Sequence, residues 1–309
     1  MYHYKPFAIV NLILAAYLGF NIYVAFPITN IPLFVLLLFL FTQSYWLVRY
    51  ISYRADKYLS GPLFLIVSAC FSLFTVAILY TILADIIWLV IFLIPYRPLI
   101  EWFYTNITFV GTIIFALTVI TYFIGLYNAR NPRIINYEIT VDKPLPRPLK
   151  IVLMADVHLN SYTSKRLIRH MVNLSNSLEP DMVLFAGDLL DGEPEPFLKR
   201  RFDDILQQLS SRYGTYAVLG NHEYYSFKVE EMIDAYEKSG MTVLRDKVKL
   251  FEELNVALIG RDDYMSYMFG MPRKPIKEIV KEAPADMMRI LLEHQHRNST
   301  ITRAIENGN

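Results

Sequence analysis

The distribution of charge along the chain constrains its fold more than any other feature of the sequence. Only five basic and three acidic side chains fall within residues 1–128, whereas residues 129–309 carry 25 basic and 26 acidic ones. Four apolar segments occupy the first part, at residues 7–26, 31–48, 63–94 and 103–127. About 20 apolar residues in a helix cross the hydrocarbon core of a bilayer. The sequence therefore predicts four transmembrane helices in residues 1–128, followed by a water-exposed region in residues 129–309.

The third apolar segment is too long for one upright helix, and Asp85 interrupts it. We interpret it as one span with an interfacial extension that ends at Pro95, since two spans would need a turn near Asp85 and two undersized helices. Asp85 is either a functional acid at membrane depth or a residue at the headgroup level beside Trp88, and we favour the second. The first segment is not a removable signal peptide, because it lacks a small-residue cleavage site and three more segments follow.

Basic residues in short loops predict the orientation of the helices. They cluster between the second and third segments and after the fourth: Arg49, Arg54, Lys57, Arg130 and Arg133. With four spans, the N-terminus and the second half of the chain share the cytoplasmic side of the membrane. A fifth span would reverse the second half, so this orientation depends on the number of spans.

Residues 129–148 read as a linker with a lead-in strand at 137–141, and from residue 149 strands and helices alternate. Buried strands are predicted at 151–154, 182–186, 215–219, 241–244 and 289–292, with a hairpin over 247–260. Helices are predicted at about 164–178, where Ser164 is the cap, and at 197–209, 229–239 and 274–281. This order predicts βαβ units and a mainly parallel sheet.

Polar side chains follow four of these strands: Asp156 and His158, Asp188, Asn221 and His222, and His294. Parallel sheets place ligand groups at the carboxyl ends of their strands. Asp156 and His158 stand two apart, and side chains with that spacing on an extended chain point the same way. Glycines 187 and 220 allow tight backbone turns before the next side chain. Carboxylate, amide and imidazole donors together suit Mn, Fe, Zn or a mixed pair of metals.

Three motifs occur in order: D-x-H at Asp156–His158, G-D-x-x-D at Gly187–Asp191 and G-N-H-E at Gly220–Glu223. In this order and at these intervals they resemble the motifs of calcineurin-like metallophosphoesterases, including the membrane-anchored bacterial branch with hydrophobic N-terminal helices. The resemblance covers roughly residues 149–309. It implies an α/β domain built as an αββα two-sheet sandwich. It also implies hydrolysis of phosphate ester or pyrophosphate bonds by a bacterial membrane protein. The basic loops predict that this reaction takes place on the cytoplasmic side, and the membrane anchor favours a lipid-linked substrate.

The resemblance also implies roles for individual residues. Asp156 and His158 would hold a first divalent metal, Asp188 would bridge two metals, and Asn221 and His294 would belong to the second. His222 would protonate the leaving oxygen or stabilise phosphoryl charge. Two such cations acidify a bridging water to hydroxide and clamp a phosphate for in-line attack.

The remaining polar residues have simpler interpretations. Asp191 and Glu223 are predicted to be structural hydrogen-bonding groups at turns, and His170 lies on a solvent-facing helix surface. Asp262 and Asp263 are either a solvated turn or support for the metal site. A net charge of +1 gives no indication of a nucleic-acid partner.

The sequence departs from the family pattern near its end. Family members carry a further G-H-x-H motif with one histidine for each metal, which does not occur before Asn309, and the last strands of the second sheet would be missing with it. His296 is a weak substitute. The alternative to an active phosphohydrolase is therefore a truncated, catalytically impaired membrane protein of the same family.

Overall fold

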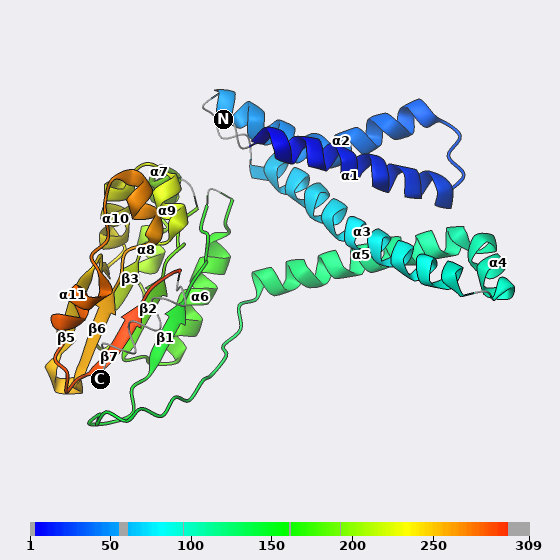
Figure 1. Cartoon of the computed structure of the whole chain (residues 1–309). Helices are drawn as coiled ribbons and strands as arrows, with labels where there is room; N and C mark the ends of the chain where they lie inside the picture. The colour runs from blue at the N-terminus through cyan, green and yellow to red at the C-terminus, as the bar shows by residue number, and fades with distance from the viewer. Residues whose placement is uncertain (1–3, 56–60, 95, 161, 192, 296–309) are drawn as a thin grey trace. The chain divides into compact units, whose positions relative to one another are not determined.

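A computed structural model describes residues 4–55, 61–94, 96–160, 162–191 and 193–295 (Figure 1). The chain divides into two compact units, residues 1–131 and 132–309. Each unit has its own secondary structure and its own apolar contacts, so each is described by itself.

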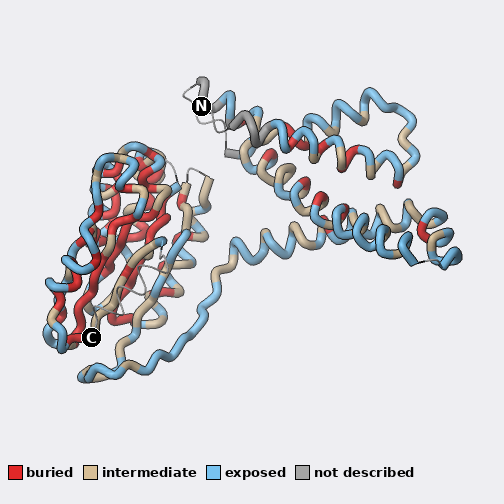
Figure 2. The backbone as a smooth tube through the Cα atoms, viewed as in Figure 1, coloured by how far each residue is buried: buried red, intermediate tan, exposed pale blue. Residues whose placement is uncertain are grey.

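Five helices form the described part of the first unit: α1 (Tyr4–Ala25), α2 (Ile31–Ala55), α3 (Gly61–Leu93), α4 (Arg97–Thr105) and α5 (Ile107–Arg130). Apolar stretches long enough to cross a membrane lie in α2, α3 and α5, and α1 contains a shorter one at Ile9–Ala25. Many residues of these helices are coloured as exposed in Figure 2, and many of the exposed side chains are large and apolar. This surface suits lipid, which confirms the predicted N-terminal region of apolar helices.

Two details of the helical unit bear on the predicted apolar segments 63–94 and 103–127. The α3 helix runs without interruption through Asp85, so the alternative with a turn at this residue is wrong. The predicted segment 103–127 is divided at Asn106, because α4 ends at Thr105 and α5 begins at Ile107. The Tyr17 hydroxyl donates a hydrogen bond to the Asp85 carboxylate, which joins α1 to α3.

The predicted lead-in strand at residues 137–141 is wrong. Among the described residues 132–150 there is no strand, and Tyr137 and Ile139 are each 82% exposed. An alternating sequence forms a stable strand only where a neighbouring strand pairs with it, and none of the described strands pairs with this segment. The linker is instead tied to the rest of the second unit by Arg147, whose guanidinium donates to both carboxylate oxygens of Asp181, with Nη1 lying 2.9 Å from Oδ2.

We expect Asp181→Asn to lower the stability of the second unit at neutral pH and to weaken its acid dependence. The hydrogen bonds from Arg147 hold the pKa of Asp181 below its usual value, although burial opposes them. The ionised Asp181 therefore stabilises the fold above its unfolded pKa of about 4. This contribution is lost as the pH falls through the lower pKa of the folded state. Pulse proteolysis of the full chain in urea, between pH 7 and pH 2, measures this. The exposed Asp234→Asn is the control, and equal acid profiles for the two variants would contradict the prediction.

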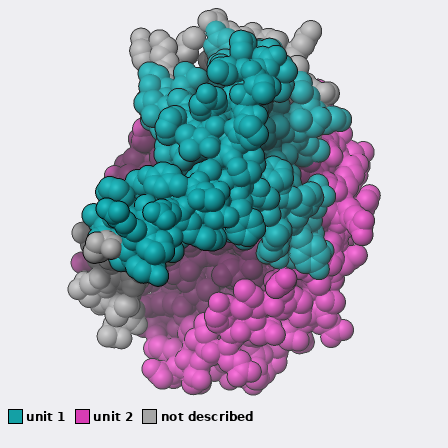
Figure 3. Space-filling view, turned by 90° about the vertical axis from the view of Figure 1, so that its right-hand side faces the viewer, with its two compact units in different colours: residues 1–131 teal, residues 132–309 magenta. Residues whose placement is uncertain are grey.

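The second unit, coloured magenta in Figure 3, contains two sheets. Four parallel strands form the first, in the order β1 (Ile151–Met154), β2 (Met182–Ala186), β3 (Thr215–Val218) and β4 (Met241–Val243). In the second sheet, β5 (Lys247–Phe251) pairs antiparallel with β6 (Val256–Gly260), which pairs parallel with β7 (Met288–Leu292). The predicted strands from residue 149 onward are thus confirmed. The prediction that 151–154 is buried is wrong, because β1 is the outermost described strand of its sheet and Leu153 is 62% exposed.

The two sheets pack face to face through apolar side chains such as Leu184 and Val218 on one and Val256 and Leu258 on the other. The outer face of the first sheet is covered by α6 (Lys165–Ser177), α7 (Pro194–Lys199), α8 (Asp203–Leu206) and α10 (Val229–Lys238). The outer face of the second is covered by α11 (Ile276–Lys281). The predicted αββα sandwich is therefore confirmed.

Helix boundaries follow local chemistry in one case and not in another. The Ser164 hydroxyl accepts from the backbone N–H of Arg166 at 3.2 Å, which confirms the predicted cap of α6. The single helix predicted at 197–209 is wrong, because Arg201 has φ +53° and separates α7 from α8. That left-handed turn lets Phe202 enter the core, where it is fully buried.

Candidate metal centre

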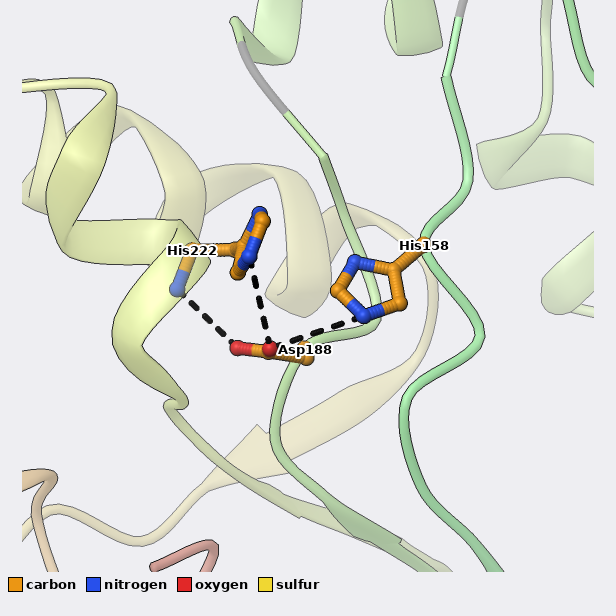
Figure 4. Close-up of side chains that lie close together, drawn as sticks. All are labelled: His158, Asp188 and His222. Carbon is orange, nitrogen blue, oxygen red and sulfur yellow. Dashed lines mark hydrogen bonds and ion pairs between the residues drawn. The ribbon is translucent and has the colours of Figure 1, made fainter. Parts of the chain in front are cut away.

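Asp188, directly after β2, lies at the centre of a cluster of histidines (Figure 4). Its Oδ2 atom is 3.6 Å from His158 Nε2, 4.0 Å from His222 Nε2 and 3.4 Å from His294 Nε2. Burial opposes ionisation of Asp188, but hydrogen bonds from His294 and from the backbone of His222 lower its pKa below the usual value. A charged carboxylate is therefore held where three imidazoles converge.

The other two predicted donors lie in the same cluster. Asp156 Oδ1 is 3.9 Å from His158 Nε2, and Asn221 Oδ1 is 3.2 Å from His294 Nε2. Two donor groups share Asp188: one contains His158 and His222, the other Asp156 and His294, and the donor atoms of each lie within 4.8 Å of one another. The structure thus brings together all six residues singled out in the sequence, in an arrangement that fits one carboxylate shared by two cations.

The backbone that presents Asp156 and His158 is not extended, contrary to the geometry assumed from the sequence. β1 ends at Met154, and Asp156 and His158 have φ values of +53° and +49°. Left-handed backbone is uncommon for residues other than glycine and persists where surrounding contacts impose it. Here the N–H groups of Asp156 and His158 donate to the carbonyls of Gly187 and Asp188, at 3.2 and 2.9 Å. Pairing with the neighbouring loop therefore positions both side chains.

The two motif glycines serve different purposes. Gly187 has φ +82°, which matches the predicted tight turn, and a Cβ there would lie 2.7 Å from the Cβ and Cγ atoms of His294. Gly220 has φ −107°, which any residue adopts, so a tight turn is the wrong reason for this glycine. A Cβ at Gly220 would instead overlap the carboxylate and backbone nitrogen of Asp188. Glycine at 220 allows the third motif to approach the second.

Glu223 joins the second and third motifs beneath the cluster. It is completely buried, and its carboxylate accepts from the backbone N–H groups of Asp188, Leu190 and Gly220 at 3.1, 3.1 and 2.7 Å. The Tyr236 hydroxyl also donates to it. Burial raises the pKa of Glu223, while these donors favour the carboxylate form. The predicted role as a structural hydrogen-bonding group is confirmed.

Asp191 contacts His222, a pairing that the sequence analysis did not identify. Its Oδ1 atom lies 2.9 Å from His222 Nδ1, which leaves Nε2 on the side of Asp188. A carboxylate in this position fixes the orientation of an imidazole ring. The signal in the sequence was the G-D-x-x-D spacing, which keeps Asp191 in the same loop as Asp188.

His294 has the polar surroundings expected of a metal-binding imidazole. Its Nδ1 lies 2.8 Å from the Ala186 carbonyl oxygen, to which it donates, so Nε2 is directed towards Asp188 and Asn221. Such an outer hydrogen bond fixes the tautomer and ring orientation of histidine ligands. The hydrogen bond with Asp188 raises the pKa of His294 to about 9, against the opposing effect of burial.

We expect the affinity of the metal-free protein for Mn²⁺ to increase between pH 7 and pH 9. Because the pKa of His294 is about 9, a cation must displace a proton from Nε2, and each displaced proton gives about a tenfold change in affinity per pH unit. The same proton stabilises the metal-free fold below about pH 6.5, and this contribution is lost as the pH rises through 9. Calorimetric titration in buffers of different ionisation enthalpy measures the proton release. His294→Gln should flatten the dependence, and a pH-independent wild-type affinity would contradict the prediction.

Asp262 and Asp263 are buried, so the hypothesis of a solvated turn is wrong. Asp262 accepts from the Tyr224 hydroxyl at 2.6 Å and from Arg245 Nε at 2.6 Å. Asp263 accepts from the Met265 N–H and caps the short helix η2 (Tyr264–Phe269). Exposed His170 lies on α6 as expected, while His296 lies outside the described residues.

Comparison with known proteins agrees with this fold. Residues 149–302 match the model of the calcineurin-like phosphoesterase family. A zebrafish (Danio rerio) transmembrane protein with metallophosphoesterase domain is 32% identical over 186 residues, or 55% of this chain and 41% of that protein. An uncharacterized metallophosphoesterase of Campylobacter jejuni is 24% identical over 87% of this chain and 69% of its own length. An uncharacterized metallophosphoesterase of Helicobacter pylori strain J99 is 33% identical over 59% of this chain and 48% of its own length.

The family match and the candidate donors at the strand ends of a two-sheet sandwich together indicate a metallophosphoesterase domain. Through its second half, the chain belongs to the calcineurin-like phosphoesterase family. The matched stretches span less than half of the zebrafish and Helicobacter proteins.

Proposed function

We propose that this protein is a membrane-anchored phosphoesterase with a centre for two divalent cations, Mn, Fe, Zn or a mixed pair. The observation that carries the proposal is the convergence of three imidazoles on the buried carboxylate of Asp188. The proposed ligands are Asp156, His158, Asp188, Asn221 and His294, with Asp188 shared. Such cations, when bound, supply Lewis acidity that activates water and neutralises phosphate charge.

Residues of the chain would orient the metal-binding carboxylate and donate a proton to the leaving oxygen. Asp188 uses Oδ2 towards the histidines, while Oδ1 accepts from the His222 N–H at 3.0 Å and keeps the carboxylate in one orientation. His222 is the proposed proton donor to the leaving oxygen. Asp191 orients its ring, and the ring of His158 packs edge-on against it at 4.5 Å between centroids. A positioned acid of this kind typically contributes about 10²–10⁴-fold to rate.

We further propose that the substrate is a lipid-linked phosphate ester or pyrophosphate on the cytoplasmic face of a bacterial membrane. The apolar helices of the first unit support a membrane environment, and relatives from zebrafish and cattle are named as transmembrane proteins. A membrane-held phosphoesterase meets substrates in the bilayer at a higher local concentration than soluble ones.

The test is hydrolysis of bis(p-nitrophenyl) phosphate by the full chain purified in detergent, after loading with Mn²⁺, Fe²⁺ or Zn²⁺. We expect turnover that EDTA abolishes and that one of these cations restores, with about two metal ions per chain by mass spectrometry. Turnover that persists after complete metal removal would overturn the proposal. Stoichiometric metal without turnover would instead identify a catalytically impaired member of the family.

A further inference from the structure

An exposed apolar surface lies beside the candidate metal centre. We call it the apolar rim and define it by five large side chains with their exposed fractions: Tyr225 (51%), Phe227 (80%), Tyr264 (40%), Tyr267 (51%) and Met268 (75%). They come from two short segments, α9 (Asn221–Tyr225) with Phe227, and the η2 helix. Isolated exposed apolar residues are common, but a gathered set beside a reactive site marks a binding surface.

The rim is continuous with the centre because α9 contributes to both. At the start of this helix the backbone N–H of His222 donates to Asp188 and Asn221 Oδ1 lies 3.2 Å from His294 Nε2, whereas Tyr225 at its end is exposed. The rings of His222 and Tyr225 pack edge to face, with their centroids 5.3 Å apart. A helix advances about 1.5 Å per residue, so the rim begins within about one helical turn of the centre.

Packing beneath the rim holds its two segments together. Phe269 of η2 contacts the ring of Phe227 at 5.1 Å and that of Tyr224 at 5.6 Å between centroids. Tyr224 is fully buried and donates to Asp262, next to the Asp263 cap of η2. Phe227 has φ +60°, an uncommon backbone for an aromatic residue, and it remains the most exposed member of the rim. The apolar side chains are thus presented to solvent by an ordered support.

We propose that the apolar rim receives the hydrocarbon part of an amphiphilic phosphate ester whose phosphate lies in the metal centre. This inference rests on the proposed function. It is supported by complementarity along one surface, since cations next to the rim suit an anionic group and the rim suits a hydrocarbon chain. The apolar helices of the same chain place it where such amphiphiles collect.

Two other occupants fit the rim less well. The chain around Phe227 carries charges of both signs, Lys228 beside Glu230 and Glu231, and Glu230 pairs with Arg245, so it presents no basic surface to a flat anionic bilayer. Five side chains are also too few for a stable dimer, which typically uses about 20–30 residues on each side. An amphiphile bound by its phosphate needs only a short apolar path.

The experiment compares p-nitrophenyl hexadecyl phosphate with p-nitrophenyl methyl phosphate, which share one chromophoric leaving group. The full chain in lipid nanodiscs, loaded with Mn²⁺, should prefer the hexadecyl ester by at least about tenfold in kcat/KM, mainly through KM. The double variant Phe227→Ser, Met268→Ser should remove most of that preference. Tyr137→Ser, which removes an exposed aromatic side chain outside the rim, should retain it.

A second measurement does not depend on turnover. Hexadecyl phosphate, but not methyl phosphate, should slow hydrogen exchange in residues 221–227 and 264–271 of the wild type and not of the double variant. Equal kcat/KM for the two esters together with no selective protection would overturn the inference, as would rim variants that change only the oligomeric state or the vesicle affinity. Absence of hydrolysis of both esters would count against the proposed function, and protection by hexadecyl phosphate would then still support the rim as a hydrocarbon site.

Discussion

Replacing Asp188 by asparagine should remove the bound metal and nearly all hydrolysis. The amide has no negative charge, and one of the two carboxylate oxygens becomes an N–H donor that faces three imidazoles. Loss of an outer hydrogen-bond partner already costs about 10–100-fold in metal affinity or activity, so loss of the shared carboxylate should cost at least about 10³-fold in turnover. Metal content by mass spectrometry and hydrolysis of bis(p-nitrophenyl) phosphate measure the two effects.

The matched control is Asp191→Asn, another carboxylate-to-amide change in the same loop. Asp191 contacts His222 and not Asp188, so this variant should keep its metal while turnover falls. Separation of the two readouts would distinguish a metal-holding residue from one that positions a proton donor. Wild-type metal content in Asp188→Asn would rule out the shared-carboxylate arrangement.

The second large effect is on stability: Glu223→Ala should lower the free energy of unfolding of the second unit by about 3–5 kcal/mol. The substitution leaves three buried backbone N–H groups and the Tyr236 hydroxyl without their acceptor. Each unsatisfied buried donor costs about 1–3 kcal/mol, although water entering the space recovers part of this. Pulse proteolysis of the full chain over a urea series measures the change.

Two further substitutions make this result specific. Glu223→Gln keeps one acceptor oxygen and the side-chain volume, so its loss of stability should be intermediate. Glu237→Ala removes an exposed carboxylate from α10 and should have little effect. If Glu223→Ala were as stable as Glu237→Ala, the network beneath Asp188 would not hold the two loops together.

Much of the fold could be predicted because its elements follow local patterns. The apolar runs that become β1, β2, β3 and β7 stand out in the sequence, and a short apolar run predicts a strand without knowledge of its neighbours. The candidate donors could be predicted for the same reason, since they lie within the first few residues after those strands. The lead-in strand at 137–141 failed because a strand also needs a pairing partner, which the pattern does not report.

The amino-acid sequence by itself determined which residues are available to a metal: a carboxylate, an amide or an imidazole after each of four apolar strands. Only the tertiary structure decided how they meet. Asp156 and His158 reach the cluster through left-handed backbone held by the Gly187–Asp188 loop, and Asp188 has room because residue 220 lacks a Cβ. The pairing of Asp191 with His222 spans 31 residues. These are contacts between distant segments, and their geometry depends on how the strands and loops pack, which no local pattern contains.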